Sequence, residues 1–284
     1  MRCSVDQRSK FALSQQVHTS NECAQMPVFS GHQEVSPKCH GGVYAIGNFD
    51  GLHIGHQALI ENAIQIAAGT SRRSAILTFD PHPRELFDAS AASFRLGNSL
   101  QKMRDLANLG TGFCVNQNFD FDFASLTPDE FVEEVISNSL SASHVVVGTD
   151  FKFGFRQAGN TEILKELCAH RGIGISILEQ VRFGGEVVSS SLIRNLLGKG
   201  EMMAAAELLG RPWTILESPR FLDGVTSFDL SIYTQLSEQE YKVRVDGTDC
   251  RANLSKKEEG QQILVLPREW TFSGFNNVVV EFVA

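Results

Sequence analysis

Apolar and polar positions follow two alternating patterns along the middle of the chain. Near-continuous apolar runs predict buried strands, and apolar positions three and four residues apart predict amphipathic helices. The predicted strands cover 43–50, 74–80, 112–119, 144–150 and 174–181. The predicted helices cover 54–68, 99–109, 128–140, 161–170 and two short segments between 189 and 209. Because strands buried on both faces are typical of parallel sheets, this alternation predicts an α/β fold with a parallel sheet covered on both faces.

Two of the predicted helices have clear start signals. Thr127-Pro128-Asp129-Glu130 combines a hydroxyl N-cap, proline at the first helical position and a glutamate that completes a capping box. The helix that follows carries its apolar residues on one face: Phe131, Val132, Val135, Ile136 and Leu140. For the helix at 99–109, Ser99 is the expected N-cap and Gly110 the expected stop.

The change of pattern along the chain predicts three regions. Residues 1–42 are polar without a periodic apolar pattern, and we expect a partly irregular N-terminal extension. Residues 43–212 contain the strand–helix alternation. After Gly210-Arg211-Pro212, short alternating segments predict a small, mostly β unit over residues 213–284.

Composition narrows the classes of function. The chain has 284 residues, 42% of them hydrophobic, with a formal net charge of −8, which is ordinary for a globular protein and unlike a general nucleic-acid binder. No uncharged apolar run approaches the ~20 residues of a membrane-spanning helix, and no signal-peptide pattern opens the sequence. Six cysteines without a C-x-x-C pair argue against a zinc cluster or disulfide framework and favour a cytoplasmic location.

The first segment with candidate chemistry lies between a predicted strand and a predicted helix. It runs from Gly47 to His56 and reads Gly-Asn-Phe-Asp-Gly-Leu-His-Ile-Gly-His. His56 falls in the first helical turn, where free N–H groups and the helix dipole favour an anion. Together with His53 it is well suited to hydrogen-bond phosphate oxygens. An accidental H-x-x-H in a loop is the alternative for the histidines in isolation.

The second segment, Ser189-Ser190-Ser191-Leu192-Ile193-Arg194, also follows a predicted strand and opens a helix. Three hydroxyls and the free N–H groups of the first turn predict a triphosphate cradle. Arg194 adds a fixed charge that can bind phosphate with two hydrogen bonds. Helix capping is the alternative explanation for the serines.

These two segments resemble the signatures of the nucleotidylyltransferases named for their HIGH motif, here His53-Ile54-Gly55-His56 and VSSSLIR, with Ser191 where the superfamily pattern has threonine. The resemblance extends to the FAD synthetase half of the bacterial bifunctional riboflavin kinase/FMN adenylyltransferases. It covers residues 43 to 212 and rests also on GNFDGLHIGHQALI, LTFDPHP, VVVGTDFKFGFRQAG and AAELLGRPW.

The resemblance implies a Rossmann-like domain that uses ATP and FMN as substrates and Mg²⁺ as cofactor, with FAD and pyrophosphate as products. It implies that His53 and His56 contact the ATP phosphates, while Ser190, Ser191 and Arg194 hold the departing pyrophosphate. The other residues that it places at ATP are Gly47, Asn48, Phe49, Asp50, Gly55 and Ser189. The sequence leaves open whether Asp50 orients a histidine or engages magnesium, and it identifies no metal ligands.

Further residues follow the second and fourth predicted strands. His82 reads as a surface turn residue, and Phe151 and Phe153 read as core residues from spacing alone. The resemblance instead places seven residues at a flavin or nucleotide pocket, with Lys152 as an additional positive charge: Asp80, His82, Asp150, Phe151, Phe153, Gly154 and Arg156.

The sequence departs from the bifunctional pattern after residue 212. The G-x-P-T-A-N mark of the riboflavin kinase module is missing, and Arg251-Ala252-Asn253-Leu254 shares only Ala-Asn with it. We therefore expect residues 213–284 to be a divergent unit or a remnant of the kinase barrel, without riboflavin kinase activity.

The leading hypothesis is a monofunctional FMN adenylyltransferase acting on small-molecule substrates, with no nucleic-acid or membrane partner. The alternatives are a related nucleotidylyltransferase with another acceptor, such as a cytidylyltransferase, and a non-catalytic flavin-nucleotide-binding paralogue. The absence of GxxxxGK[ST] and GxGxxG disfavours a P-loop kinase and a dinucleotide dehydrogenase. The sequence leaves the oligomeric state open.

Overall fold

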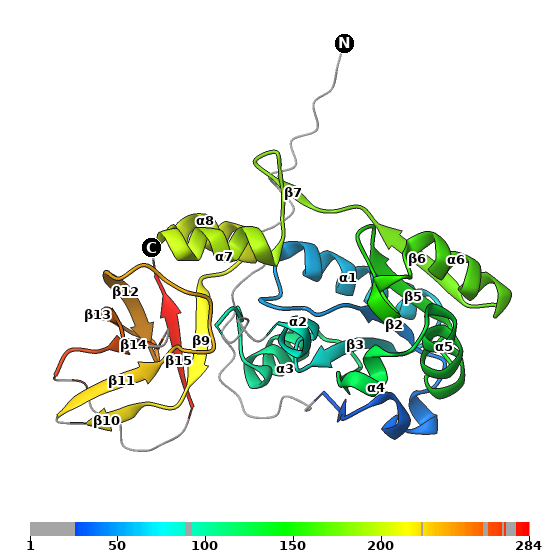
Figure 1. Cartoon of the computed structure of the whole chain (residues 1–284), viewed down its shortest axis with the longest axis horizontal. Helices are drawn as coiled ribbons and strands as arrows, with labels where there is room; N and C mark the ends of the chain where they lie inside the picture. Colours follow the sequence, from blue (N-terminus) through cyan, green and yellow to red (C-terminus); the bar gives the residue numbers. More distant parts are fainter. Residues whose placement is uncertain are drawn as a thin grey trace, which may run out of the picture.

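A six-stranded parallel sheet forms the first half of the protein in the computed structural model (Figure 1). The structure describes residues 26–88, 93–222, 224–257, 261–268, 270 and 277–283. The sheet order is β1-β4-β3-β2-β5-β6, and every neighbouring pair is parallel. The strands are β1 (Val28–Phe29), β2 (Val43–Ile46), β3 (Ser74–Asp80), β4 (Phe113–Asn118), β5 (His144–Gly148) and β6 (Gly174–Leu178).

Helices cover both faces of this sheet. Alternate residues of each strand belong to different cores: Tyr44 and Ile46 pack into one, while Val43 and Ala45 pack into the other. The first core is completed by α6 (Thr161–His170) and by a helix that begins as α5 (Pro128–Glu130) and continues as the π-helix Phe131–Ser139. The second is completed by α1 (Ile54–Gly69) and α3 (Ser99–Asn108). The predicted parallel α/β sheet with two covered faces is confirmed.

The order of the strands locates the place where a ligand is expected. The chain moves from the central β2 outward to β3 and β4, and then returns to add β5 and β6 on the other side. Between β2 and β5 the connections therefore leave the sheet in opposite directions. Ligands of open α/β sheets bind in the crevice beyond the carboxyl ends of the strands at such a point.

The capping box predicted at Thr127 is present, and all five apolar residues expected on the following helix face are buried. The N-cap of α3 differs from the prediction. Asn98 is the N-cap and accepts a hydrogen bond from the Gln101 N–H at 2.8 Å, whereas the Ser99 hydroxyl donates to the Asp80 carboxylate at 2.6 Å. Ser99 was a plausible cap by residue type, but a distant carboxylate binds its hydroxyl.

Several short elements were absent from the sequence prediction. They are β1, α2 (Pro83–Phe87), α4 (Phe121–Ala124), the hairpin of β7 (Arg182–Phe183) and β8 (Glu186–Val187), and the 3-10 turns His32–Glu34, Pro37–Cys39 and Phe155–Gln157. β1 and the first two turns lie within the predicted extension 1–42. Residues 1–25 of that extension are outside the described part of the chain. Elements this short leave almost no periodic pattern, because each supplies only two to five residues.

The second structural unit, called the β-rich half below, is a seven-stranded antiparallel sheet formed by residues 213–282, with the order β10-β11-β14-β13-β12-β15-β9 (Figure 1). Its core is shared with the helices α7 (Ser190–Lys199) and α8 (Met202–Leu209), which Figure 1 shows lying beside this sheet. The strands are β9 (Trp213–Glu217), β10 (Arg220–Leu222), β11 (Val225–Asp229), β12 (Glu240–Val245), β13 (Thr248–Lys256), β14 (Gln262–Val265) and β15 (Val278–Phe282).

We propose the division after residue 212 as the domain boundary. Within the described residues, no helix is long and apolar enough to cross a membrane.

Candidate active site

The loop from Gly47 to His53 leaves β2 in a conformation fixed by close packing. Phe49 and Leu52 have positive φ values of 51° and 49°, and both side chains are buried. The Phe49 ring packs against Gly47, where an added Cβ would lie 3.3 Å from the ring. A Cβ on Gly51, whose φ is +76°, would meet the Leu96 side chain at 2.7 Å. Glycine is therefore required at position 51 by the positive φ and by the Leu96 side chain, and glycine at position 47 leaves room for the Phe49 ring.

His53 and His56 stack on each other at the N-terminus of α1. Their ring centroids are 3.6 Å apart with an interplanar angle of 16°, and the Phe49 ring packs edge-on against His56 at 5.3 Å. His53 is the N-cap, and its Nδ1 accepts a hydrogen bond from the His56 N–H at 3.2 Å. A Cβ on Gly55 would come within 3.2 Å of the His53 ring, so glycine leaves the space that the stack needs.

Both imidazoles are neutral at physiological pH. Burial lowers the pKa of His53 to about 4, and burial followed by the nearby His53 and Arg194 lowers the pKa of His56 well below its usual value. The Nδ1 atom of His56 is buried without a hydrogen-bond partner. Two neutral rings at a helix N-terminus can donate hydrogen bonds to phosphate oxygens without a prior change of charge.

Asp50 and Arg194 form a buried ion pair between the two sequence motifs. Arg194 Nη2 lies 2.6 Å from one Asp50 carboxylate oxygen, and the Leu96 N–H donates to the other at 3.0 Å. Arg194 Nε also donates to the Phe94 carbonyl at 2.7 Å, and its guanidinium stacks over the Phe94 ring at 4.9 Å. Burial raises the pKa of Asp50, and the adjacent guanidinium opposes this shift. Asp50 thus orients the arginine, which is neither of the two roles, orienting a histidine or engaging magnesium, that the sequence left open.

The three consecutive serines have different environments. The Ser189 hydroxyl caps α7 by accepting from the Leu192 N–H at 3.2 Å. The Ser190 hydroxyl donates to the Asp50 carbonyl at 3.0 Å, which joins the second motif to the first. Ser191 is exposed. Two of the three hydroxyls expected to hold phosphate are therefore engaged within the protein.

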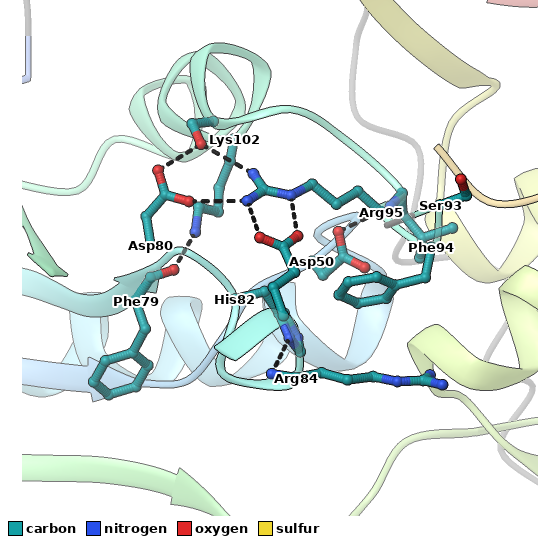
Figure 2. Close-up of polar contacts among 12 residues, drawn as sticks. Asp50, Phe79, Asp80, His82, Arg84, Ser93, Phe94, Arg95 and Lys102 are labelled. Carbon is teal, nitrogen blue, oxygen red and sulfur yellow. Dashed lines mark hydrogen bonds and ion pairs between the residues drawn. The ribbon is translucent and has the colours of Figure 1, made fainter. Parts of the chain in front are cut away.

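A second polar network lies beside the ion pair and is drawn in Figure 2. Asp80 at the end of β3 accepts from Ser99 and, at 3.3 Å, from Arg95. Arg95 also binds Glu85 with two hydrogen bonds, at 2.5 and 2.6 Å. Lys102 donates to the Phe79 carbonyl at 2.9 Å, and burial lowers its pKa. Arg95 and Lys102 were not identified from the sequence because no local motif marks them.

His82 lies at the start of α2, where its Nδ1 accepts from the Arg84 N–H at 3.1 Å. Its ring packs edge-on against Phe94 at 4.9 Å. Burial, followed by the charges of Arg194, Lys102 and Arg95, lowers its pKa to about 3. His82 therefore belongs to the neighbourhood of the Asp50–Arg194 pair, and it is partly buried, unlike a surface turn residue.

The residues after β5 divide into an exposed set and a packed set. Asp150, Lys152 and Arg156 are exposed, and the Asp150 charge acts on the pKa of His53. Phe153 is buried in the core and stacks with the partly buried Phe151 at 5.5 Å. Gly154, with a φ of +72°, packs against Pro128, where an added Cβ would come within 2.8 Å. Phe153 and Gly154 thus fix the conformation of this loop by packing against the core and against Pro128.

A group of phenylalanines lines the carboxyl ends of β3 and β4. Phe119 contacts Phe79 at 5.7 Å and Phe87 at 6.3 Å, and Phe87 contacts Phe121 at 6.3 Å. Phe87 and Phe121 are 66% and 67% exposed, which is unusual for large apolar side chains. The alternation of phenylalanine with aspartate at 119–123 was the available sequence signal for this surface.

The described residues contain no group of three or more histidine, cysteine, aspartate or glutamate side chains that could hold a metal ion. The Asp50 carboxylate is occupied by Arg194 and the Leu96 N–H. The described residues therefore form no protein cage for a magnesium ion, and an ion held mainly by substrate phosphates and water needs none.

The depressed histidine pKa values predict how stability depends on pH. His53 and His82 stay neutral when folded, but the unfolded chain binds their protons near pH 6.5. The difference in pKa between the folded and the unfolded chain therefore contributes fully to the free energy of unfolding above pH 6.5. This contribution is lost as the pH falls toward 4 for His53 and toward 3 for His82. We expect the free energy of unfolding to fall by about 1–2 kcal/mol per histidine between about pH 7 and pH 5.

Denaturant titration of the wild type and of His82→Asn at both pH values measures this dependence. Asparagine can still cap α2 but does not titrate, so the variant should lose less stability on acidification. An equal loss in both proteins would show that His82 is not neutral in the folded state.

The parallel sheet, its crossover point and the imidazoles at a helix N-terminus are typical of α/β proteins that bind nucleotides. A family model described as FAD synthetase matches residues 35–192, which is more than half of the chain, and the chain belongs to this family. The resemblance inferred from the sequence motifs is thereby confirmed.

Two curated relatives support the assignment. An FAD synthetase from Listeria monocytogenes is 35% identical over 174 residues, which are 61% of this chain and 70% of that protein. A bifunctional riboflavin kinase/FMN adenylyltransferase from Escherichia coli is 33% identical over 175 residues. These are 62% of this chain and only 56% of the bifunctional protein.

A solved structure described as a macrolide-efflux protein from Streptococcus pneumoniae matches with a TM-score of 0.74 and 22% identity. The match covers 90% of this chain and 89% of that one, so the similarity in fold extends over both the parallel and the antiparallel sheet.

Proposed function

We propose that this protein is an FMN adenylyltransferase, which transfers the adenylyl group of ATP to FMN and releases pyrophosphate. The observation that carries the proposal is the stacked, neutral pair His53–His56 at the α1 N-terminus, next to the Asp50–Arg194 ion pair, in a member of the FAD synthetase family. These groups offer hydrogen-bond donors and a fixed positive charge to a triphosphate at the carboxyl edge of the sheet.

The reaction requires positioning and charge stabilisation more than proton transfer. A phosphate oxygen of FMN attacks the α-phosphorus of ATP, and the bond from that phosphorus to the bridging oxygen of pyrophosphate breaks. The FMN phosphate is already an anion, so no strong general base is needed. His53 and His56 donate to oxygens of the ATP phosphates, and Arg194 stabilises the negative charge that develops on the pyrophosphate.

The α7 N-terminus completes the phosphate site in this proposal. The Ser190 and Ser191 N–H groups belong to the first helical turn, where no intrahelical acceptor is available to them. Ser191 contributes an exposed hydroxyl, while Ser189 and Ser190 keep the helix and the Asp50 loop in place. Magnesium enters as the complex with ATP, since this ion is commonly held by substrate phosphates and water rather than by a cage of protein ligands.

We place the flavin ring on the exposed phenylalanines Phe87 and Phe121. Stacking on phenyl groups stabilises a bound aromatic ring system. This surface lies beyond the carboxyl ends of the strands, as the two histidines do. The exposed side chains after β5 (Asp150, Lys152 and Arg156) would contact FMN or ATP from the neighbouring strand, while Phe151, Phe153 and Gly154 support their loop.

Replacing Phe121 with serine is expected to raise KM for FMN about 10-fold, because one stacking partner is worth about 1–3 kcal/mol. KM for ATP should stay within about two-fold, since ATP would bind through the other motifs. Steady-state kinetics with each substrate varied in turn measures both values. Phe221→Ser, at an exposed phenylalanine of β10, is the matched control and should change neither KM. An unchanged KM for FMN in Phe121→Ser would place the flavin elsewhere.

The direct test offers the purified protein ATP and magnesium with either FMN or riboflavin, and separates the flavin products by chromatography. The proposal expects FAD from FMN and no product from riboflavin. FMN or FAD formed from riboflavin would reveal a kinase in residues 213–284. Flavin binding without product would favour the non-catalytic paralogue. Neither product nor flavin binding would favour the related transferase with another acceptor. We further propose that the protein acts in the cytoplasm on these small molecules, without a nucleic-acid or membrane partner.

A further inference from the structure

A short segment between α2 and α3 connects the two halves of the protein. We refer to residues 93–98 as the bridging segment. The Arg95 N–H donates to the Ile232 carbonyl at 3.2 Å, and the Arg95 carbonyl accepts from the Thr234 N–H at 2.9 Å. The Ser93 hydroxyl donates to the Ser231 carbonyl at 2.6 Å. The bridging segment thus pairs with the β-rich half much as a strand would, although it belongs to the first half in sequence.

The edge strand β9 holds the same segment from its other end. Trp213 Nε1 donates to the Leu96 carbonyl at 2.8 Å, and Trp213 is only 1% exposed. Asn98 Nδ2 donates to the Leu216 carbonyl at 2.5 Å and to Glu217 at 3.3 Å. Because these donors and acceptors are largely shielded from water, each hydrogen bond restricts the position of the segment.

The bridging segment also contacts the candidate active site. The Phe94 carbonyl and ring receive Arg194, and the Leu96 N–H donates to Asp50. Phe94 also packs against His82, and Figure 2 shows Phe94 and Arg95 beside the network of the site. Both members of the Asp50–Arg194 pair are therefore held by a segment that the β-rich half anchors.

We infer that Asn98 and Trp213 are positioning residues for adenylyl transfer, acting through the bridging segment on the Asp50–Arg194 pair. The inference rests on the proposed function. The β-rich half then has a role in the reaction through the bridging segment: its backbone and Trp213 fix Phe94 and Leu96, and these fix Arg194 and Asp50. A displaced guanidinium stabilises the developing charge less well, and a shift of about 1 Å can slow a reaction substantially.

Two conservative variants test the inference. Asn98→Asp keeps an oxygen that can cap α3 but loses the amide donor to Leu216 and places a carboxylate beside Glu217. Trp213→Phe keeps an aromatic ring in the core but loses the donor to Leu96. We expect kcat to fall about 5- to 20-fold in each, with KM for ATP and FMN within about two-fold of wild type.

Each variant has a matched control away from the bridging segment. Asn160 caps α6 in the same way as Asn98 caps α3, so Asn160→Asp makes the same chemical change at another helix. Tyr241 shares the Trp213 core through Phe282 and donates its hydroxyl to the Ser237 carbonyl, so Tyr241→Phe also removes one donor from that core. Both controls should keep kcat within about two-fold, even if their melting temperatures fall as much as those of the test variants.

Hydrogen exchange of the Arg95 and Leu96 amides supplies a readout independent of activity. Exchange should accelerate about 10-fold or more in Asn98→Asp and Trp213→Phe and stay unchanged in the controls. Wild-type kcat in both test variants, with or without faster exchange, would overturn the inference, as would an equal loss of kcat in the controls. If the wild type forms no FAD, the proposed function fails and the inference fails with it. An active wild type with unaffected variants removes the inference alone.

Discussion

Replacing His56 with alanine is expected to slow FAD formation about 10²- to 10³-fold, comparable to the loss of one preorganised donor from an active site. The His56 ring stacks on His53 and packs against Phe49, so its orientation is fixed before substrate binds. Since its pKa lies well below the usual value, the ring acts as a neutral donor, and its effect should not require acidic pH. Single-turnover measurements at saturating ATP and FMN determine the rate of the chemical step.

The control for this prediction is His170→Ala, which removes an exposed histidine from the end of α6. It should leave the rate within about two-fold of wild type. His56→Asn tests the hydrogen bond separately from the ring, since an amide can donate at a similar place and should recover part of the loss. A wild-type rate in His56→Ala would exclude the proposed role of this residue, and the phosphate contacts would then rest on His53 and α7.

Replacing Asp50 with asparagine is expected to lower the free energy of unfolding by about 3 kcal/mol and the rate of FAD formation by about 10²-fold. The change removes the charge that neutralises Arg194 in a largely buried site, and breaking one side of such a pair leaves the other charge uncompensated. Without the carboxylate, the guanidinium is also free to leave the place where the proposed pyrophosphate binds. Denaturant titration and steady-state kinetics measure the two effects.

A double-mutant cycle with Arg194→Met distinguishes the two consequences. The double variant removes both charges, so it should be about 1–2 kcal/mol more stable than the sum of the single losses predicts, while its activity stays low. Strictly additive losses of stability would show that the two side chains do not interact as the 2.6 Å contact indicates. Wild-type activity in Asp50→Asn would show that the pair is structural only.

The sequence predicted the framework well because the framework depends on local patterns. Buried strands such as Ser74–Asp80 and helices such as Thr161–His170 lie where apolar periodicity placed them. The capping box at Thr127 was predictable for the same reason, since all its interactions join residues within one helical turn. Prediction failed for the N-cap of α3, where Ser99 and Asn98 are both suitable caps and the distant Asp80 decides between them.

The candidate site was predictable in its motifs but not in the partners of their side chains. Two serines expected to face phosphate are engaged within the protein, and Asp50 pairs with an arginine that is 144 positions away in the sequence. Arg95 and Lys102 have no motif around them and enter the network only because α3 packs beside the end of β3. Such partners depend on which segments the fold brings together.

The sequence by itself therefore determined the parallel α/β class and the family, and it predicted phosphate binding at two helix N-termini, since each of these rests on residues close together in the chain. Only the tertiary structure decided that the histidines are neutral, that Asp50 restrains Arg194, and that the bridging segment joins the β-rich half to the site. The neutral state follows from burial, and the ion pair and the bridge follow from contacts between remote segments. The neutral state, the ion pair and the bridge are all properties of tertiary packing, and no local pattern of residues specifies them.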